Sequence, residues 1–444
     1  MWPKMKNKLI IHIPTNNTEE RLYAIKVLIK NILGLEYTIE INCGVTDTYI
    51  CFGGKTICIK DHFFGRYTQP LSYLSAENMP TPKYFSFIFS SEEITPVLYG
   101  NDECQINDNN IICGIDIIAS AYFMLSRWEE YADKRRDEHD RFVGKYSTAY
   151  NHNFLHRPIV NEYAAIIWNM LKHLNFDGKA AENKFECHIT HDIDILRSNS
   201  RLKSMIGDMV KRHDIKLALS RLLPPYTDTA NTYDFLMTQS ESIGKQSTFY
   251  FMAADYRPEY FLYEGYLHKK KFKRLIAEIK QRQHIIGFHP GYNTCTSQRR
   301  WSEQKTNLEK ASETKITLCR QHFLQIEIPY TFNILEENHI SHDSTLGYPD
   351  CEGFRCGTGN EFNVFDFLNR KELNVKERPL IIMDTCIRNQ NLTMNETEKI
   401  YTHYIDICKK YNTPITILFH NSSFDNYHWK GWRELYTRII TQLK

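Results

Sequence analysis

Apolar and alternating runs in the second half of the chain predict strands separated by amphipathic helices. Strands are expected at residues 187–190, 247–252, 285–288, 324–328, 380–383 and 414–419. The spacing of apolar residues predicts helices between them, for example at 233–243, 266–281, 300–317 and 396–410. A regular alternation of strands and helices is typical of a parallel sheet or barrel that is covered by helices.

The first part of the chain mixes short strands with helices. Strands are expected at 9–14, 37–41, 49–52, 56–59 and 84–89, and helices at 19–33, 116–131 and 158–174. The helix at 116–131 carries Arg127, Glu129 and Glu130, which fit either a functional site or a helix that docks two domains. Residues 175–184 are rich in Asn, Gly and charges. We therefore predict a mixed α/β accessory domain at 1–180 and a second domain at 181–444.

Polar side chains follow the ends of several strands predicted in the second domain. Asp192 and Asp194 come after the first of them, His289 after the third, and Asp384 and His420 after the last two. In parallel α/β folds the chemistry is found at the carboxyl ends of the strands. We therefore expect these five side chains to meet at one face of the sheet.

The pair Asp192 and Asp194 is the strongest chemical signal, because residues two apart on an extended chain point to the same side. Two neighbouring carboxylates call for a cation between them or a shared proton. Asp194 and His289 form a plausible oxygen and nitrogen ligand pair for a divalent metal such as zinc. Asp192 would act as general base on a metal-bound water, and His420 would protonate the leaving group. These roles point to metal-assisted hydrolysis of an amide or ester.

The sequence allows more than one role for Arg320 and for Asp384. Arg320 could orient the base or bind substrate through a forked hydrogen bond. Asp384 could be catalytic, cap a helix or hold an arginine.

Composition narrows the class of protein and of partner. The chain has 444 residues with 42% apolar and 24% charged residues, which is ordinary for a globular protein. Its formal net charge of +2 gives no reason to expect a nucleic-acid partner. The 12 cysteines contain no CxxC pair, and residues 1–17 do not have the pattern of a signal peptide. With no apolar run near ~20 residues, we expect a cytoplasmic protein without a membrane span.

Short motifs in the second domain resemble the polysaccharide deacetylases of the NodB-homology type, carbohydrate esterase family 4. Residues 190–194 (THDID) resemble the family's first motif, 285–290 (IIGFHP) the second, and 418–421 (LFHN) the last. Residues 344–348 and 353–358 are similar to an uncharacterised bacterial branch, and residues from Pro96 through the helix ending at Tyr131 resemble the N-terminal domain of that branch.

The resemblance implies a fold, an activity and a metal site. The fold would be a distorted (β/α) barrel of about seven strands, with the smaller mixed α/β domain before it. The activity would be removal of an N- or O-acetyl group from a sugar. A divalent metal, most simply zinc, would be held by one Asp and two His, with Asp192 as base and Asp194 as metal ligand.

One position departs from the family pattern. The second motif of the family has two histidines four residues apart, and the partner of His289 here is Asn293, a poor zinc ligand. The third ligand is then missing or supplied by His322, His191 or His342. We favour His322, because Arg320 lies where the third motif of the family has its arginine.

We therefore expect a metal-dependent carbohydrate deacetylase with Asp192, His420, Arg320 and Asp384 as catalytic residues and Asp194, His289 and His322 as metal ligands. Substrate binding is assigned to Arg355, Asn293 and Tyr292. Two alternatives remain: a catalytically impaired glycan-binding or scaffold protein, and an amidohydrolase that acts on a non-sugar amide. The sequence does not reveal the sugar, the acyl group, the role of the N-terminal domain or the oligomeric state.

Overall fold

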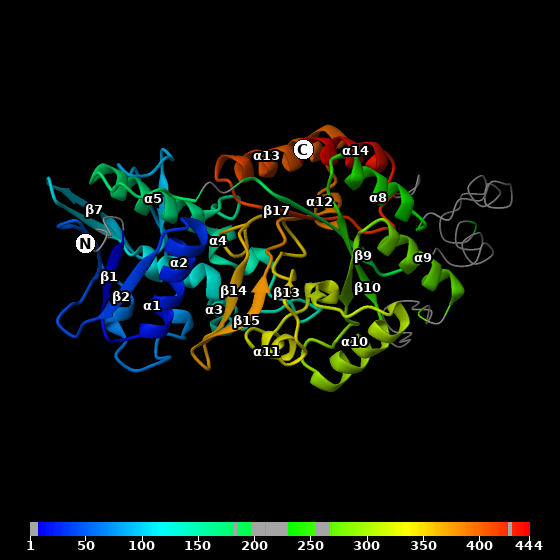
Figure 1. Ribbon diagram of the computed structural model, residues 1–444, viewed down its shortest axis with the longest axis horizontal. Coiled ribbons are helices and arrows are strands. Elements are labelled where there is room, and N and C mark those ends of the chain that lie inside the picture. Colours follow the sequence, from blue (N-terminus) through cyan, green and yellow to red (C-terminus); the bar gives the residue numbers. More distant parts are fainter. Residues whose placement is uncertain are drawn as a thin grey trace, which may run out of the picture. The chain divides into compact units, whose positions relative to one another are not determined.

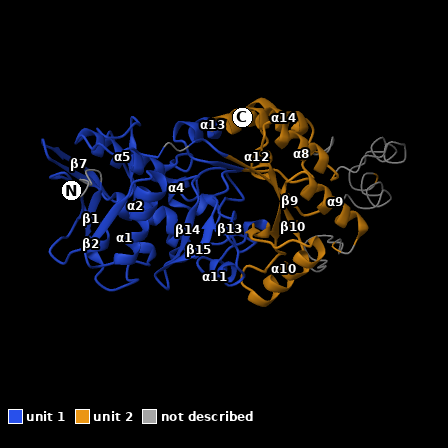
Figure 2. Cartoon of the chain, viewed as in Figure 1, with its two compact units in different colours: residues 1–186, 323–382, 404–416 blue, residues 187–322, 383–403, 417–444 orange. Residues whose placement is uncertain are grey.

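The computed structural model describes residues 8–181, 184–196, 230–253, 269–424 and 429–444, together with Met209 and Leu267. This part of the chain is mixed α/β and divides into two compact units (Figure 2). Unit 1 comprises residues 1–186, 323–382 and 404–416, and unit 2 comprises residues 187–322, 383–403 and 417–444. The domain boundary expected at residue 180 stays a prediction.

The first part of unit 1 is built around a six-stranded sheet with the strand order β2-β1-β3-β4-β8-β7. Parallel pairs join β1 to β2 and β4 to β8, and the other neighbours are antiparallel. The strands are β1 (Leu9–Ile13), β2 (Tyr37–Ile41), β3 (Thr48–Phe52), β4 (Lys55–Ile59), β7 (Gly100–Ile106) and β8 (Asn110–Ile115). A separate two-stranded sheet pairs β5 (Lys83–Phe85) with β6 (Thr95–Val97), so the strand expected at 84–89 is shorter than predicted.

The helices expected in the first part of unit 1 are present, except that the one expected at 116–131 is divided into two. They are α1 (Thr18–Ile25), which continues as a π-helix over Lys26–Ile32, α2 (Ile117–Ser126), α3 (Trp128–Ala132), α4 (Thr148–Asn151) and α5 (Ile159–His173). The continuous helix expected at 116–131 is wrong, because Arg127 separates α2 from α3 with a φ of 54°. Glu129 and Glu130 bind the guanidinium of Arg127, which helps to hold a backbone conformation that residues other than glycine rarely adopt.

The later segments of unit 1 contain α11 (Tyr330–Glu337), β13 (His342–Asp343), β14 (Phe362–Asp366) and β15 (Lys371–Glu377). β14 and β15 form an antiparallel hairpin, and β13 runs parallel to β15. The strand expected at 324–328 is wrong: Phe323 and Leu324 have φ values of 61° and 55°, which a strand does not accept. The strand in this region lies earlier, at β12 (Leu318–Cys319) in unit 2.

Unit 2 contains a row of parallel strands with the order β12-β11-β10-β9, followed by β17. These strands are β9 (Cys187–Ile193), β10 (Ser247–Met252) and β11 (Ile285–His289), and the order continues through β17 (Ile415–Leu418) to β16 (Ile382–Met383). The first residues of β17 and of β16 are assigned to unit 1, and β16 directly precedes Asp384. The order does not return to its starting strand within the described residues, so the closed barrel is not confirmed and the sheet is open. Alternating strands and helices suit both forms, which is why the sequence did not separate them.

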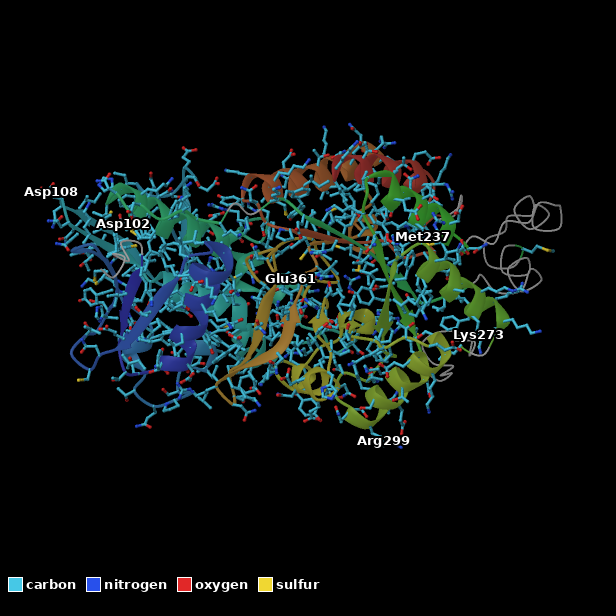
Figure 3. All side chains as sticks on the ribbon, in the orientation of Figure 1. Asp102, Asp108, Met237, Lys273, Arg299 and Glu361 are labelled. Atoms are coloured by element: carbon cyan, nitrogen blue, oxygen red, sulfur yellow. The ribbon has the colours of Figure 1, made fainter. Side chains whose placement is uncertain are left out.

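Helices cover the sheet of unit 2: α8 packs on β10, α9 on β11, and α14 beside α8 (Figure 1). The helices of unit 2 are α8 (Tyr233–Ser242), α9 (Lys270–Gln281), α10 (Gln298–Ser312), α12 (Asp384–Arg388) and α14 (Trp432–Gln442). α13 (Met394–Lys410) begins in unit 2, and its residues from Tyr404 onward belong to unit 1. Met237 on α8 is buried, whereas Lys273 on α9 and Arg299 on α10 project into solvent (Figure 3). The helix expected at 266–281 begins at Lys270 in the described part, and residue 266 lies outside it.

Candidate metal centre

The two acids of the THDID segment separate at the end of β9. Asp192 is in the strand and almost fully buried, whereas Asp194 follows the last strand residue and its side chain is 29% exposed. His191 lies between Thr190 and Asp192, so the alternation of the strand turns it to the opposite side. There its ring contacts Phe249 and Tyr436 in the core. His191 is therefore far from a ligand position, and its neighbour Asp192 is the residue that faces the site.

Asp194, His289 and His322 bring their ligand atoms within 4.8 Å of one another. Oδ1 of Asp194 is 3.3 Å from Nε2 of His289 and 3.8 Å from Nε2 of His322. This oxygen is buried and accepts no hydrogen bond from the described residues. One carboxylate and two imidazoles are a common ligand set for zinc that leaves a coordination position open. The donor set and the unused oxygen thus fit a divalent metal.

Each ligand comes from a different strand end or the segment just after it. Asp194 follows β9, His289 is the last residue of β11, and His322 lies three residues beyond β12. Because β9, β10, β11 and β12 are parallel neighbours, their carboxyl ends share one edge of the sheet.

The hydrogen bond of His289 sets its tautomer. Nδ1 of His289 lies 2.7 Å from the backbone oxygen of Arg320, so this nitrogen carries a proton and donates it. Nε2 is then available on the side of Asp194 and Asp192, which is the arrangement seen in metal-binding histidines. Burial acts to lower the pKa of His289, whereas the charges of Asp192 and Asp194 raise it above its ordinary value.

His322 and Asp194 are each held in the charge state that a metal ligand needs. Burial lowers the pKa of the His322 imidazole to about 3, so the ring is neutral near pH 7. Burial would raise the pKa of Asp194, but the neighbouring His289 and the protonated His420 outweigh it and hold this pKa well below its usual range. A neutral imidazole and an ionised carboxylate are the forms that bind metal.

Asp192 is held by a buried arginine. Nη1 of Arg320 donates to Oδ1 of Asp192 at 3.0 Å and to Oγ1 of Thr190 at 2.8 Å. The guanidinium also lies over the ring of Tyr250, 4.7 Å from its centroid. Oδ2 of Asp192 remains 3.8 Å from Nε2 of His289. One carboxylate oxygen is therefore fixed by Arg320, and the other faces the candidate metal position.

His420 forms a dyad with Asp384 beside these residues. Oδ1 of Asp384 is 2.8 Å from Nδ1 of His420, and Oδ2 accepts from the backbone N–H of His420 at 2.7 Å. Nε2 of His420 points to Oδ2 of Asp194, 3.9 Å away. Burial would lower the pKa of His420, but Asp384, followed by Asp194, raises it to about 10. The ring is thus protonated near pH 7 and oriented as a proton donor.

The structure places the three residues expected to bind substrate in two different units. Asn293 is exposed with a φ of 57°, Tyr292 is half-buried, and both follow the strand that ends in His289. Arg355 is buried in unit 1, where Nε and Nη2 bind Glu130 and Nη1 donates to the backbone oxygen of Gly347 at 2.6 Å. Their roles in substrate binding stay predictions. His342, the remaining alternative ligand, belongs to unit 1, where its Nε2 lies 3.3 Å from Oε2 of Glu361.

Three residues at the site were not singled out from the sequence. Thr190 and Tyr250 hold the guanidinium of Arg320, and Asn421 binds the backbone on both sides of Asp194. The strand pattern could have indicated Thr190, because it lies two residues before Asp192 on the same face of a strand. The contacts of Tyr250 and Asn421 depend on long-range pairing and carry no local signal.

One family model matches the first part of the chain. The sequence model of a family of unknown function, DUF7033, matches residues 9–176. No curated protein matches the chain. Among the described residues, no helix is long and apolar enough to cross a membrane.

Several solved structures are similar at low identity. A protein named as a polysaccharide deacetylase from Mycobacterium smegmatis is 12% identical, with 59% of this chain and 85% of that chain covered and a TM-score of 0.38. A wild-type CE4 family pseudoenzyme from Bacillus anthracis is 9% identical, with 59% and 62% covered and a TM-score of 0.31. A peptidoglycan N-acetylglucosamine deacetylase is 12% identical, with 59% and 83% covered and a TM-score of 0.31.

Proposed function

We propose that the chain is a metal-dependent hydrolase that removes an acyl group, most simply acetyl, from a sugar or polysaccharide precursor. The observation that carries the proposal is the position of Asp194 between three histidines. Its Oδ1 faces the two candidate ligands His289 and His322, and its Oδ2 faces the protonated His420. A metal position, a base and an acid are thus gathered around one carboxylate.

A divalent ion held by Asp194, His289 and His322 would supply Lewis acidity, which polarises an acyl carbonyl and makes water a better nucleophile. Asp192 accepts the proton of the attacking water through the oxygen that Arg320 leaves open. His420 then donates its Nε2 proton to the leaving amine or alcohol, while Asp384 keeps the ring in place. Burial of Arg320 and Asp192 keeps this pair out of bulk water, so their orientation is fixed before substrate arrives.

The sugar as substrate is supported by the resemblance of the three motifs, and by no contact in the structure. The same residues would serve hydrolysis of a non-sugar amide, so the substrate class needs its own test.

Metal content of the purified full chain tests the ligand set. We expect about one divalent ion per chain, its loss in His322→Ala, and its retention in the matched variant His342→Ala, whose imidazole belongs to unit 1. Full metal occupancy in His322→Ala would remove His322 from the ligand set.

Acetate release from an N-acetylglucosamine tetramer tests the reaction. Turnover that disappears in Asp192→Asn at unchanged metal content supports the proposal. A metal-loaded protein that hydrolyses simple amides but no acetylated sugar would favour the amidohydrolase alternative. A chain without metal and without turnover would contradict the proposal and favour a binding or scaffold role.

A further inference from the structure

Asp194 occupies a position that the sheet itself does not fix. β9 ends at Ile193, which is the last residue of β9 in register with β10. Backbone pairing therefore stops one residue before the candidate metal ligand. The side chain of Asp194 can serve three histidines only if other contacts hold the chain beyond the strand.

Asn421 makes these contacts on both sides of Asp194. Its backbone N–H donates to the backbone oxygen of Asp192 at 3.4 Å, and its side-chain Nδ2 donates to the backbone oxygen of Ile195 at 2.8 Å. Asn421 is 1% exposed, so water does not compete for either hydrogen bond.

The two protons of the Asn421 amide have well-defined acceptors. One faces Ile195, and the other faces the backbone oxygen of Ala230, also at 2.8 Å. Because both neighbouring groups are carbonyl oxygens, the side-chain amide is oriented with Nδ2 toward them. Its Oδ1 is buried without a hydrogen-bond partner among the described residues. The hydroxyl of Tyr233, 3.3 Å from Nδ2, donates to the backbone oxygen of Leu196 at 2.9 Å. The backbone oxygens of the two residues after Asp194, Ile195 and Leu196, thus accept hydrogen bonds from Asn421 and Tyr233.

We propose that Asn421, assisted by Tyr233, is a positioning residue that fixes Asp194 for metal binding. The inference rests on the metal site of the proposed function and deepens it. Asn421 follows His420 directly, so the same residue sets the distance between the proton donor and the metal ligand. Groups that orient a metal ligand without touching the metal commonly change affinity by 10- to 100-fold.

The test titrates Zn²⁺ into the metal-free full chain by calorimetry, and measures thermal unfolding of the same metal-free samples. Asn421→Ala is expected to bind Zn²⁺ at least about tenfold more weakly than the parent. The matched control is Thr232→Val, which removes the hydrogen bond from Thr232 to the backbone oxygen of Asn421 at 2.8 Å but leaves both bonds around Asp194. Its Zn²⁺ affinity is expected to stay within about twofold of the parent, even where its unfolding temperature falls.

Equal affinity of Asn421→Ala and the parent would overturn the inference, and so would an equal loss in Thr232→Val. If Asn421→Ala does not fold, Tyr233→Phe tests the same support, since it removes the hydroxyl that donates to Leu196 and accepts from Nδ2 of Asn421. It is expected to weaken Zn²⁺ binding about threefold, and unchanged affinity would count against the inference. A parent chain that binds no Zn²⁺ contradicts the proposed function as well, whereas the ratio between variant and parent concerns Asn421 alone.

Discussion

Nδ1 of His289 donates to the backbone oxygen of Arg320, and the side chain of that same Arg320 holds Asp192. One residue thus orients a candidate metal ligand through its main chain and the candidate base through its guanidinium. The two functions of Arg320 can be separated, because a substitution removes the guanidinium that holds Asp192 but keeps the backbone oxygen that accepts from His289.

Replacing Arg320 by Lys keeps a positive charge but removes the forked geometry. A lysine ammonium cannot reproduce the paired donation to Thr190 and Asp192 together with stacking on Tyr250. We expect kcat to fall on the order of 100-fold with metal content unchanged. Steady-state kinetics of Arg320→Lys against Arg299→Lys, a change at an exposed position of α10, measure this effect. Equal kcat values in the two variants would refute the role of Arg320.

Asp384→Asn tests the proton donor. The carboxylate of Asp384 raises the pKa of His420 to about 10 against the opposing effect of burial. A general acid works only while it is protonated, so activity is lost as the pH rises above this pKa. Without the charge of Asp384 the pKa of His420 falls, and the basic limb of the kcat profile moves to lower pH.

The control for this change is Asp234→Asn, at a position on α8 whose side chain is 84% exposed. Its kcat profile should match that of the parent chain. A basic limb that does not move in Asp384→Asn would show that His420 is not the group that titrates.

The buried His191 gives unit 2 a pH-dependent stability. Burial lowers the pKa of His191 to about 4, against an ordinary value near 6.5. Between these values the unfolded chain binds the proton and the folded chain does not, so stability is complete above about pH 6.5 and falls as the pH drops toward 4. The loss amounts to about 3 kcal/mol.

Urea unfolding at pH 7 and pH 5 captures about 2 kcal/mol of this loss in the parent, and the same measurement is made on His191→Gln and on His403→Gln, a surface change on α13. His191→Gln should show a smaller difference between the two pH values than the other two proteins. The same pH dependence in all three would mean that another group is responsible.

A substitution of Arg355 tests whether this residue forms a structural ion pair or contacts the substrate. Its guanidinium binds Glu130, which also accepts from Arg127, and all three side chains are buried. Removing Arg355 leaves the buried carboxylate of Glu130 with Arg127 alone and its Oε2 without a donor, so Arg355→Met should lower the free energy of unfolding by about 3 kcal/mol. KM measured well below the unfolding temperature should then be unchanged. A raised KM with full stability would instead support the substrate-binding role predicted from the sequence.

Much of the site follows from the sequence because parallel strands end at a common edge. That rule alone places Asp192, Asp194 and His289 together, and the position of Arg320 in its motif led to His322. His322 lies beside Asp194 and His289 although the strand before it is β12 and not the one expected at 324–328, and its role as a metal ligand stays a prediction.

Other features depend on contacts that no local pattern encodes. The left-handed backbone at Arg127 is accompanied by carboxylates that reach its guanidinium only after folding, and the binding of Asn421 to Ile195 joins segments far apart in the chain. Whether a row of alternating strands and helices closes into a barrel also depends on the pairing of its first and last strands, which periodicity does not report. Cytoplasmic localisation and a carbohydrate substrate remain predictions.

The three candidate ligands are supplied by three separate stretches of chain, none within a helical turn of another. An ion bound by all of them would act as a cross-link, comparable to a disulfide that closes two long loops at once. Occupancy would then govern the lifetime of the fold as well as turnover, so a chelator would expose unit 2 to proteolysis, and scarcity of metal in the cell would lower the abundance of the protein along with its activity.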